Sequence, residues 1–230
     1  MTKEELLQRY ESLGNEGDYL AALSLYEQAV AEAPDARVLS DYGYLLYGHA
    51  RRELRRAVDL YEQAIALESG YDKPHWQLIG ARAALEETGW AVRAYEQRLR
   101  EAPREVREHR FLVSAYLHAH AYERALAVVE AGLELTPGDA TLVAQRGEAK
   151  AALGDPEGAL ADWRLALELE PEDIGPLYSS AFLLAREGRP AEAIEAWQAI
   201  IDWNEVRGYR LQTAWPRQEL QRLRGEEASP

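Results

Sequence analysis

Small apolar and aromatic side chains recur along the chain at a nearly constant spacing, with polar and charged residues filling the intervals. One alanine returns every 34 positions, with a single interval of 35, at Ala22, Ala57, Ala91, Ala125, Ala159 and Ala193. In five of these units a ring follows four positions later, at Tyr26, Tyr61, Tyr95, Trp163 and Trp197. A period of this length is typical of stacked helical hairpins. The pattern therefore predicts an all-α architecture repeated about six times.

The alanine and the ring also predict how the two helices of each hairpin meet. A methyl-sized side chain lets the helices approach closely, and a bulky one a turn later fills the groove beside it. Turn signals separate the helices at 154–156 and 188–190, where glycine supplies a positive φ and proline begins the next helix. Pro137 and Pro171 stand where the second helices should end. Each unit is therefore expected to be helix, turn, helix.

The fifth unit resembles the tetratricopeptide repeat family most closely. The family's small, turn, aromatic and proline positions are occupied there by Gly147, Gly154, Asp155, Ala159, Trp163, Ala166 and Pro171. The third unit adds Trp76, Ile79 and Gly80 in the family's tryptophan, leucine, glycine spacing. The resemblance covers residues 3 to about 207 and implies a right-handed α-α superhelical solenoid of about six helix-turn-helix repeats. Three departures stand out. Gly43 and Ala57 are two residues further apart than the family spacing, Gly80 and Ala91 are one residue closer, and Arg146 and Lys150 replace apolar residues of a first helix.

The repeat phase gives the expected domain organisation. We expect one solenoid over 1–225, with repeats at 3–36, 37–71, 72–105, 106–139, 140–173 and 174–207. A capping helix is expected at about 209–224, because a solenoid must cover its terminal apolar face. Pro216 suits the first turn of that helix, and Leu211, Trp215, Leu220 and Leu223 offer an apolar stripe. The tail 226–230 is expected to fray.

Composition narrows the class of protein. The net charge of −14 argues against nucleic acid as the main partner, because phosphate binding needs a basic surface. The chain has no cysteine, which excludes a disulfide or a thiolate zinc site. The amino terminus is charged, and no 18-residue apolar run occurs, so we expect a soluble, cytoplasmic protein that does not enter a membrane.

Arginines gather at two places in this acidic chain. They are Arg51, Arg52, Arg55 and Arg56, and then Arg98, Arg100, Arg104, Arg107 and Arg110. Two interpretations stay open at this point. The arginines form a solvated surface with local ion pairs, or they recruit an acidic partner.

The sequence shows no set of residues with the spacing of a catalytic or metal site. His118 and His120 lie two apart, so on a helix they point about 200° away from each other and cannot share one ion. No glycine-rich phosphate loop and no nucleophile elbow is present. We therefore expect no catalytic residue, no metal and no cofactor, and a protein that is not an enzyme.

The resemblance implies that the first helix of each repeat lines a concave groove that binds a partner segment. The family's groove positions select Trp76, Arg107, Arg110, Ser114, His118, Thr141, Glu148, Tyr178, Phe182 and Arg186. Tyr178 and Phe182 lie four apart on one helical face, next to Arg186. They either form an aromatic shelf for the partner or pack against the final helix, and both possibilities stay open.

The functional prediction is a non-enzymatic scaffold or adaptor that holds a protein or peptide segment in the concave groove. The alternative is a structural protein that self-associates through its helical repeats. The chain is accordingly expected to be a monomer or a weak homo-oligomer.

Overall fold

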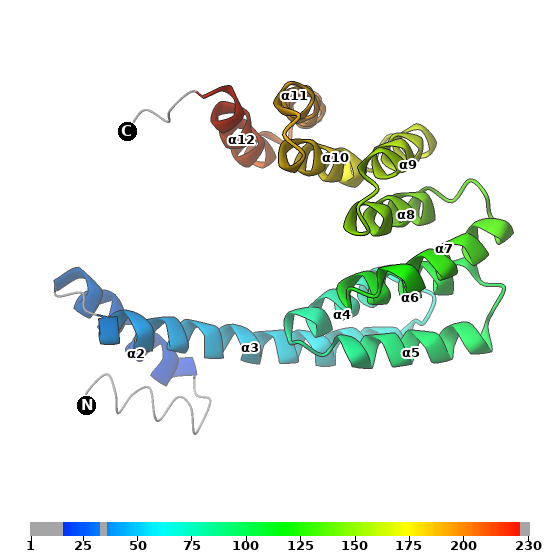
Figure 1. Cartoon of the computed structure of the whole chain (residues 1–230). Coiled ribbons are helices and arrows are strands. Elements are labelled where there is room, and N and C mark those ends of the chain that lie inside the picture. The colour runs from blue at the N-terminus through cyan, green and yellow to red at the C-terminus, as the bar shows by residue number, and fades with distance from the viewer. Residues whose placement is uncertain (1–15, 33–35, 226–230) are drawn as a thin grey trace. The chain divides into compact units, whose positions relative to one another are not determined.

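The computed structural model describes residues 16–32 and 36–225, and within these ranges helices joined by turns and short loops make up the structure, without a strand (Figure 1). Its helices are α2 (Glu16–Glu32), α3 (Ala36–Leu67), α4 (Asp72–Ala84), α5 (Thr88–Glu101), α6 (Val106–His118), α7 (Tyr122–Leu135), α8 (Ala140–Ala152), α9 (Pro156–Leu169), α10 (Gly175–Arg186), α11 (Pro190–Val206) and α12 (Ala214–Arg224), with a 3₁₀ turn, η1, at Arg210–Thr213. The predicted all-α repeat architecture is confirmed.

The helices divide into two compact units. Unit 1 comprises Met1–Glu87 and unit 2 comprises Thr88–Pro230. Within each unit, packing joins mainly helices that follow one another in the sequence, as expected for a repeat protein. The single solenoid predicted for 1–225 stays a prediction.

Unit 2 contains three helical hairpins, α6–α7, α8–α9 and α10–α11, which close in the same way. His120, Gly154 and Gly188 have φ values of 55°, 85° and 71°. After each of them the next amide donates to a carbonyl five residues earlier, at 2.9 Å in all three turns. This left-handed residue and closing bond are the usual end of an α-helix. In unit 1 the turn after α4 repeats this geometry, with Glu86 at φ 64°.

The alanine position of each hairpin in unit 2 is buried as the repeat pattern predicts. Ala125, Ala159 and Ala193 are fully buried. In α8–α9 the backbone of Gly147 lies directly against Trp163, since a Cβ added to the glycine would stand 2.6 Å from the ring nitrogen. The same nitrogen donates to the carbonyl of Ala144 at 3.1 Å. Glycine is required at this crossing because no side chain would fit.

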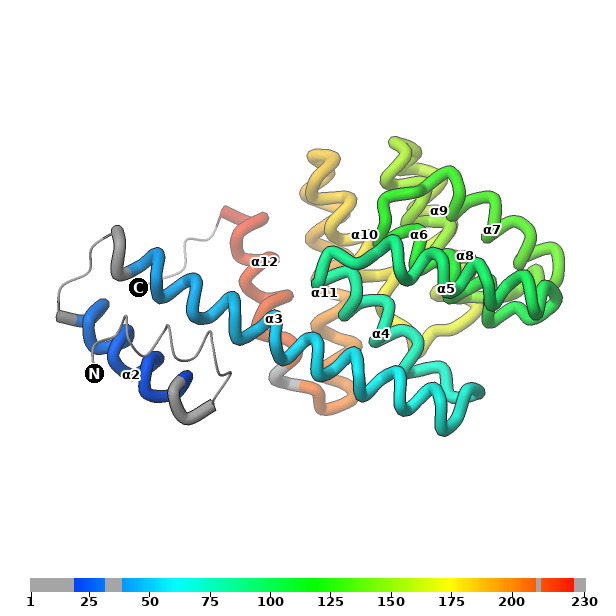
Figure 2. The backbone as a smooth tube through the Cα atoms, turned by 90° about the horizontal axis from the view of Figure 1, so that it is seen from below, coloured from blue at the N-terminus to red at the C-terminus, as the bar shows by residue number. Residues whose placement is uncertain are grey.

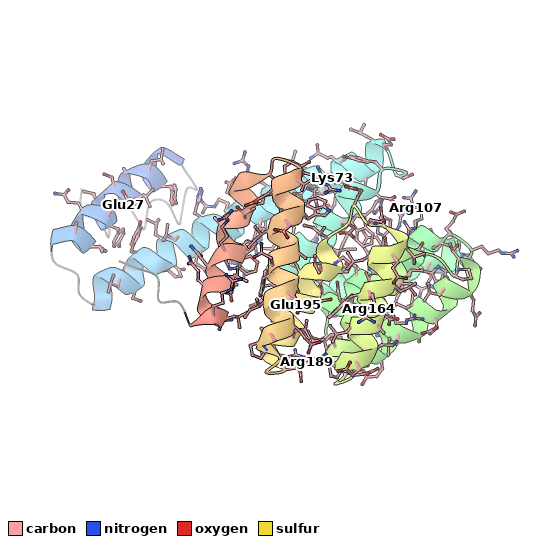
Figure 3. All side chains as sticks on the ribbon, turned by 90° about the horizontal axis from the view of Figure 1, so that it is seen from above. Glu27, Lys73, Arg107, Arg164, Arg189 and Glu195 are labelled. Carbon is pink, nitrogen blue, oxygen red and sulfur yellow. The ribbon has the colours of Figure 1, made fainter. Side chains whose placement is uncertain are left out.

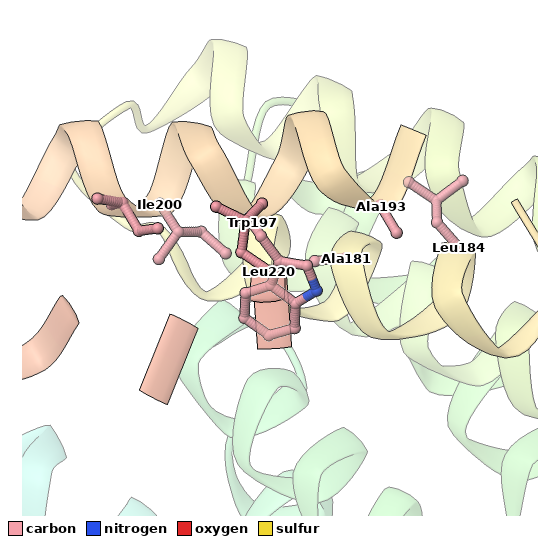
Figure 4. Close-up of a cluster of buried hydrophobic side chains, with 7 residues drawn as sticks. Ala181, Leu184, Ala193, Trp197, Ile200 and Leu220 are labelled. Atoms are coloured by element: carbon pink, nitrogen blue, oxygen red, sulfur yellow. The ribbon is translucent and has the colours of Figure 1, made fainter. Parts of the chain in front are cut away.

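The carboxyl end of unit 2 is covered by α12, which begins five residues later than the expected 209. Trp197 of α11 packs in one cluster with Ala181 of α10 and Leu220 of α12 (Figure 4). Pro216 is buried at the start of the helix, and Gly225 ends it with φ 71°. The side chain of Leu211 and the tail 226–230 lie outside the described residues.

Unit 1 differs from the predicted repeats, because α3 is one unbroken helix of 32 residues where the phase gives a helix-turn-helix over 37–71 (Figure 2). Arg52 stands where Glu86, His120, Gly154 and Gly188 turn the chain, but it continues the helix. The segment 51–56 has the sequence Arg-Arg-Glu-Leu-Arg-Arg, in which every residue favours a helix and no proline or capping residue interrupts it. The predicted turn in this repeat is wrong for that reason.

Each half of α3 packs on a different neighbour within unit 1. Leu45 and Tyr42 of the first half lie in a cluster with Ala22 and Tyr26 of α2. The second half packs on α4. There Arg82 of α4 bridges Glu62 of α3 and Glu87, at 2.6 and 2.5 Å. Ala57 is only half-buried, whereas the alanines at the same position of the other five repeats are almost completely buried.

Candidate binding surface

The structure places the ten predicted groove residues at very different depths. Exposed are His118, Glu148, Phe182 and Arg186, half-buried are Trp76, Arg107, Arg110, Thr141 and Tyr178, and buried is Ser114. Trp76 belongs to α4 of unit 1, and the other nine belong to α6, α8 and α10 of unit 2. These three first helices contact one another in order. The nine predicted residues of unit 2 therefore lie in one row, which α6, α8 and α10 form.

Most arginines at the third-to-fourth junction are held by partners within the chain. Arg98 forms two hydrogen bonds of 2.7 Å with Glu108, which is buried. The guanidinium of Arg110 pairs with Asp139, and Asp139 also accepts the amide of Leu142 at 2.9 Å, so it caps α8. These pairs tie α5 to α6 and α6 to α8. The structure thus favours local ion pairing over a basic docking patch for Arg98 and Arg110.

Arg146 and Lys150, which depart from the family pattern, have a common partner. Asp162 of α9 is buried, and its two carboxylate oxygens accept from Arg146 at 2.7 and 3.0 Å. The ammonium of Lys150 stands 2.7 Å from the same carboxylate. The two cations thus compensate an acid on the facing helix, because an unpaired buried carboxylate would be costly.

The carboxyl-terminal end of the α6, α8, α10 row carries an aromatic cluster that we name the aromatic platform: Tyr178, Phe182, Trp197 and Trp215. Trp215 of α12 stacks on Tyr178, with ring centroids 6.2 Å apart and planes 11° apart. Phe182 stands edge-on to Trp197 at 5.1 Å. Phe182 and Trp215 nonetheless stay 48% and 43% exposed. The rings therefore pack on the last helices and also present an apolar surface, so both possibilities for Tyr178 and Phe182 apply together.

Glu148, one of the ten predicted groove residues, has a carboxylate with a raised pKa. Desolvation by the surrounding protein, and then the negative charge of Asp173, raise the pKa of Glu148 to about 6. The side chain is still accessible to solvent. A residue that is accessible yet crowded by protein atoms is what a recessed surface produces, and its charge changes close to neutral pH.

A hollow of about 450 Å³ lies on another side of unit 2, between α9, α10 and α11. Leu160, Leu177 and Leu184 are among its apolar lining residues. At its rim Arg189 contacts Glu157 at 2.7 Å and Glu192 at 2.6 Å (Figure 3 labels Arg189). Arg189, Glu157 and Glu192 are therefore paired with one another within the chain.

No group of three or more histidine and acidic side chains in 16–32 and 36–225 is placed to hold a metal ion. Over the same ranges, no helix combines the length and the apolar composition that crossing a membrane requires.

These observations define a class of protein, an all-helical repeat protein whose hairpins pack small residues against rings. The chain has the tetratricopeptide repeat fold. It is similar to the crystal structure of TTC0263, a thermophilic TPR protein of Thermus thermophilus, with a TM-score of 0.54 and 20% identity over 94% of this chain and 98% of that one. A tetratricopeptide repeat protein of Parabacteroides merdae gives a TM-score of 0.53 and 15% identity over 99% and 94%. No family model and no curated protein matches the chain.

Trp215 was not among the predicted groove residues. Its position indicated only the apolar stripe of the capping helix, because the spacing within 209–224 shows only which residues share a face. That Trp215 stacks on Tyr178 depends on how α12 lies across α10 and α11. The signal that could have found it was its aromatic character, since a leucine would have served the stripe equally well.

Proposed function

We propose that the chain is a non-enzymatic scaffold that binds a segment of another protein along the α6, α8, α10 row. The aromatic platform is the observation that supports this most directly. Exposed, rigid rings supported from below by other rings are the usual anchors of protein interfaces. Phe182 and Trp215 have this character, because Trp197 underneath holds both at 5.1 and 5.2 Å.

The charged groups along the row indicate which residue types the proposed partner should carry. Arg186 is exposed one turn beyond Phe182, and its contact with Glu187 is a solvent-exposed pair worth little. Glu148 and His118 stand exposed on α8 and α6. The proposed ligand is therefore a peptide with an apolar or aromatic anchor residue for the platform and a carboxylate near it for Arg186.

The test selects peptides of roughly 12 residues from a displayed library against the purified chain and measures their affinities by calorimetry. Phe182→Ala should weaken the selected peptides by about tenfold or more, because it removes an anchor of the platform. Leu165→Ala is the matched control, since Leu165 is 39% exposed on α9, a second helix away from the row. Peptides that bind the Phe182 variant as well as the native chain would refute the site. A library that yields no binder would count against the function.

A further inference from the structure

The helix α3 carries a continuous exposed or half-buried stripe of small and apolar residues, which we name the α3 stripe: Leu39, Gly43, Leu46, Ala50, Ala57, Tyr61 and Ala64. Successive members lie three, four or seven positions apart, so they share one face of the helix. Leu39 is 52% exposed and Leu46 is 40% exposed. The face that packs on α2 is a different one and contains Tyr42 and Leu45.

The stripe consists of the two inner faces of a hairpin that has not closed. In the fifth repeat Gly147 lies against Ala159 and Trp163. Gly43, Ala57 and Tyr61 correspond to these three positions in the second repeat, with two extra residues between Gly43 and Ala57, but there both halves belong to one unbroken helix. Leu39 and Ala57 are 18 positions apart, which is about five turns, so both halves point to the same side.

One copy of α3 cannot bring these faces together. Gly43 and Ala57 are 14 positions apart, or about 21 Å along the helix axis. A second α3 in antiparallel orientation can, because it places Gly43 opposite Ala57 of the partner subunit and, by symmetry, Ala57 opposite the partner's Gly43. The two-fold axis then passes near Ala50.

We propose that the chain forms a two-fold dimer in which the two α3 helices pack antiparallel along the α3 stripe. Each copy supplies the first half of the second repeat to the other, which is a reciprocal exchange of a structural element. The stripe suits this pairing, since Gly43, Ala50, Ala57 and Ala64 recur every seven residues and place a small residue at every second turn. Such residues let two helices approach closely while Leu39, Leu46 and Tyr61 fill the spaces between them.

The partner is a second copy because the stripe is complementary to itself. Its small and large positions are those of one hairpin, and the equivalent hairpins of unit 2 close tightly with the same residue types. Pairing would also bury Ala57, which is the exception among the six repeat alanines. All residues involved lie in 36–67, so the proposal is independent of peptide binding by unit 2.

Cysteine cross-linking of the full chain tests the proposal, because the native sequence contains no cysteine. The double variant Gly43→Cys/Ala57→Cys, oxidised at low concentration, should give a covalent species of roughly twice 26.0 kDa. Both positions are exposed or half-buried, and a Cβ at residue 43 meets no atom within 4 Å. The matched control is Gly43→Cys/Gln63→Cys, since Gln63 is exposed on the same helix and lies on the face opposite the stripe. The control should stay monomeric on a non-reducing gel.

Two results would overturn the exchange. An internal disulfide in a monomer would show that the second repeat closes on itself, and equal cross-linking of the control would show random collision. Sedimentation of the unmodified chain gives a second measurement. We expect a dimer at micromolar concentration, a monomer for Leu39→Glu and a dimer for Gln63→Glu, with unchanged helix content by circular dichroism. A native chain that is monomeric throughout refutes the proposal.

Discussion

The second and fifth repeats carry a small residue and a ring at corresponding positions, yet only the fifth forms a hairpin. In α8–α9 the chain reverses at Gly154, and Asp155 caps α9 by accepting the amide of Gly158 at 2.9 Å. In α3 the corresponding residues are Arg52 and Glu53, and the helix continues. The apolar pattern alone therefore does not decide where a hairpin closes. The turn residue and the capping residue decide where the hairpin closes. They determine whether a continued helix or a reversal of the chain has the lower free energy.

The largest expected difference between the two repeats lies at the ring position. Trp163→Ala should lower the free energy of unfolding by about 3–5 kcal/mol, because the indole is buried and fills the crossing. Tyr61→Ala should cost less than about 2 kcal/mol in the dilute monomer, because that ring is only half-buried in α3. Urea denaturation followed by circular dichroism compares them. Equal losses would mean that the second repeat is as tightly packed as the fifth.

Replacing the glycine by alanine should have opposite effects on stability in the two repeats. Gly147→Ala should destabilise the chain by about 2–3 kcal/mol, since its Cβ would stand 2.6 Å from the Trp163 ring nitrogen. Gly43→Ala should raise the stability by about 1 kcal/mol in the dilute monomer, because alanine favours the helix and meets no atom within 4 Å. Thermal melts of both variants suffice. A loss at Gly43 in dilute solution would contradict the open arrangement of α3.

The ion pairs of the two repeats should also differ in how much they stabilise the chain. Asp162→Asn should cost about 2 kcal/mol, because Arg146 and Lys150 then lose the buried carboxylate that they share. Glu53→Gln in α3 should cost less than about 0.5 kcal/mol, since its pair with Arg56 is exposed and within one helix. Chemical denaturation of the two variants provides the measurement. Similar costs would show that burial of Asp162 does not matter.

The smallest effect depends on pH and concerns Glu148 in the fifth repeat. Its pKa is raised from 4.5 to about 6 in the folded chain, so the folded state binds the proton more readily than the unfolded state. Its contribution to stability is therefore present below pH 4.5 and is lost as the pH rises through about 6. Glu148→Gln should remove this dependence and stabilise the chain at pH 7 by less than about 1 kcal/mol, since the side chain is accessible.

Melting temperatures between pH 4 and pH 7.5 measure the effect, with Glu134→Gln on α7 as the control. A pH profile that is the same for the native chain and the Glu148 variant would contradict the raised pKa. It would also show that the accessible side of Glu148 is hydrated well enough to cancel the crowding by protein.

The sequence predicted the repeat fold well, because its signals are local. The alanine and ring spacing, Gly154 and Gly188 each act within a few residues, and the structure confirms the hairpins that they predict in unit 2. The extra two residues between Gly43 and Ala57 marked the second repeat as unusual. Their consequence could not be read from spacing, since it depends on the balance between a continued helix and a turn.

The candidate site was less predictable than the fold. The phase selected Tyr178 and Phe182, but their support by Trp215 requires the crossing of three helices. Likewise Arg146 and Lys150 were visible as departures from the pattern, whereas their partner Asp162 lies on the facing helix. Long-range pairs of this kind leave no trace in a single sequence.

The continuity of α3 has a mechanical consequence for unit 1. A helix of 32 residues is about 48 Å long, and it carries α2 on its first half and α4 on its second. Without a flexible joint between the halves, α3 acts as a rigid rod. If α3 rotates at the end on which α2 packs, the end on which α4 packs rotates with it. The helices α2 and α4 therefore move together.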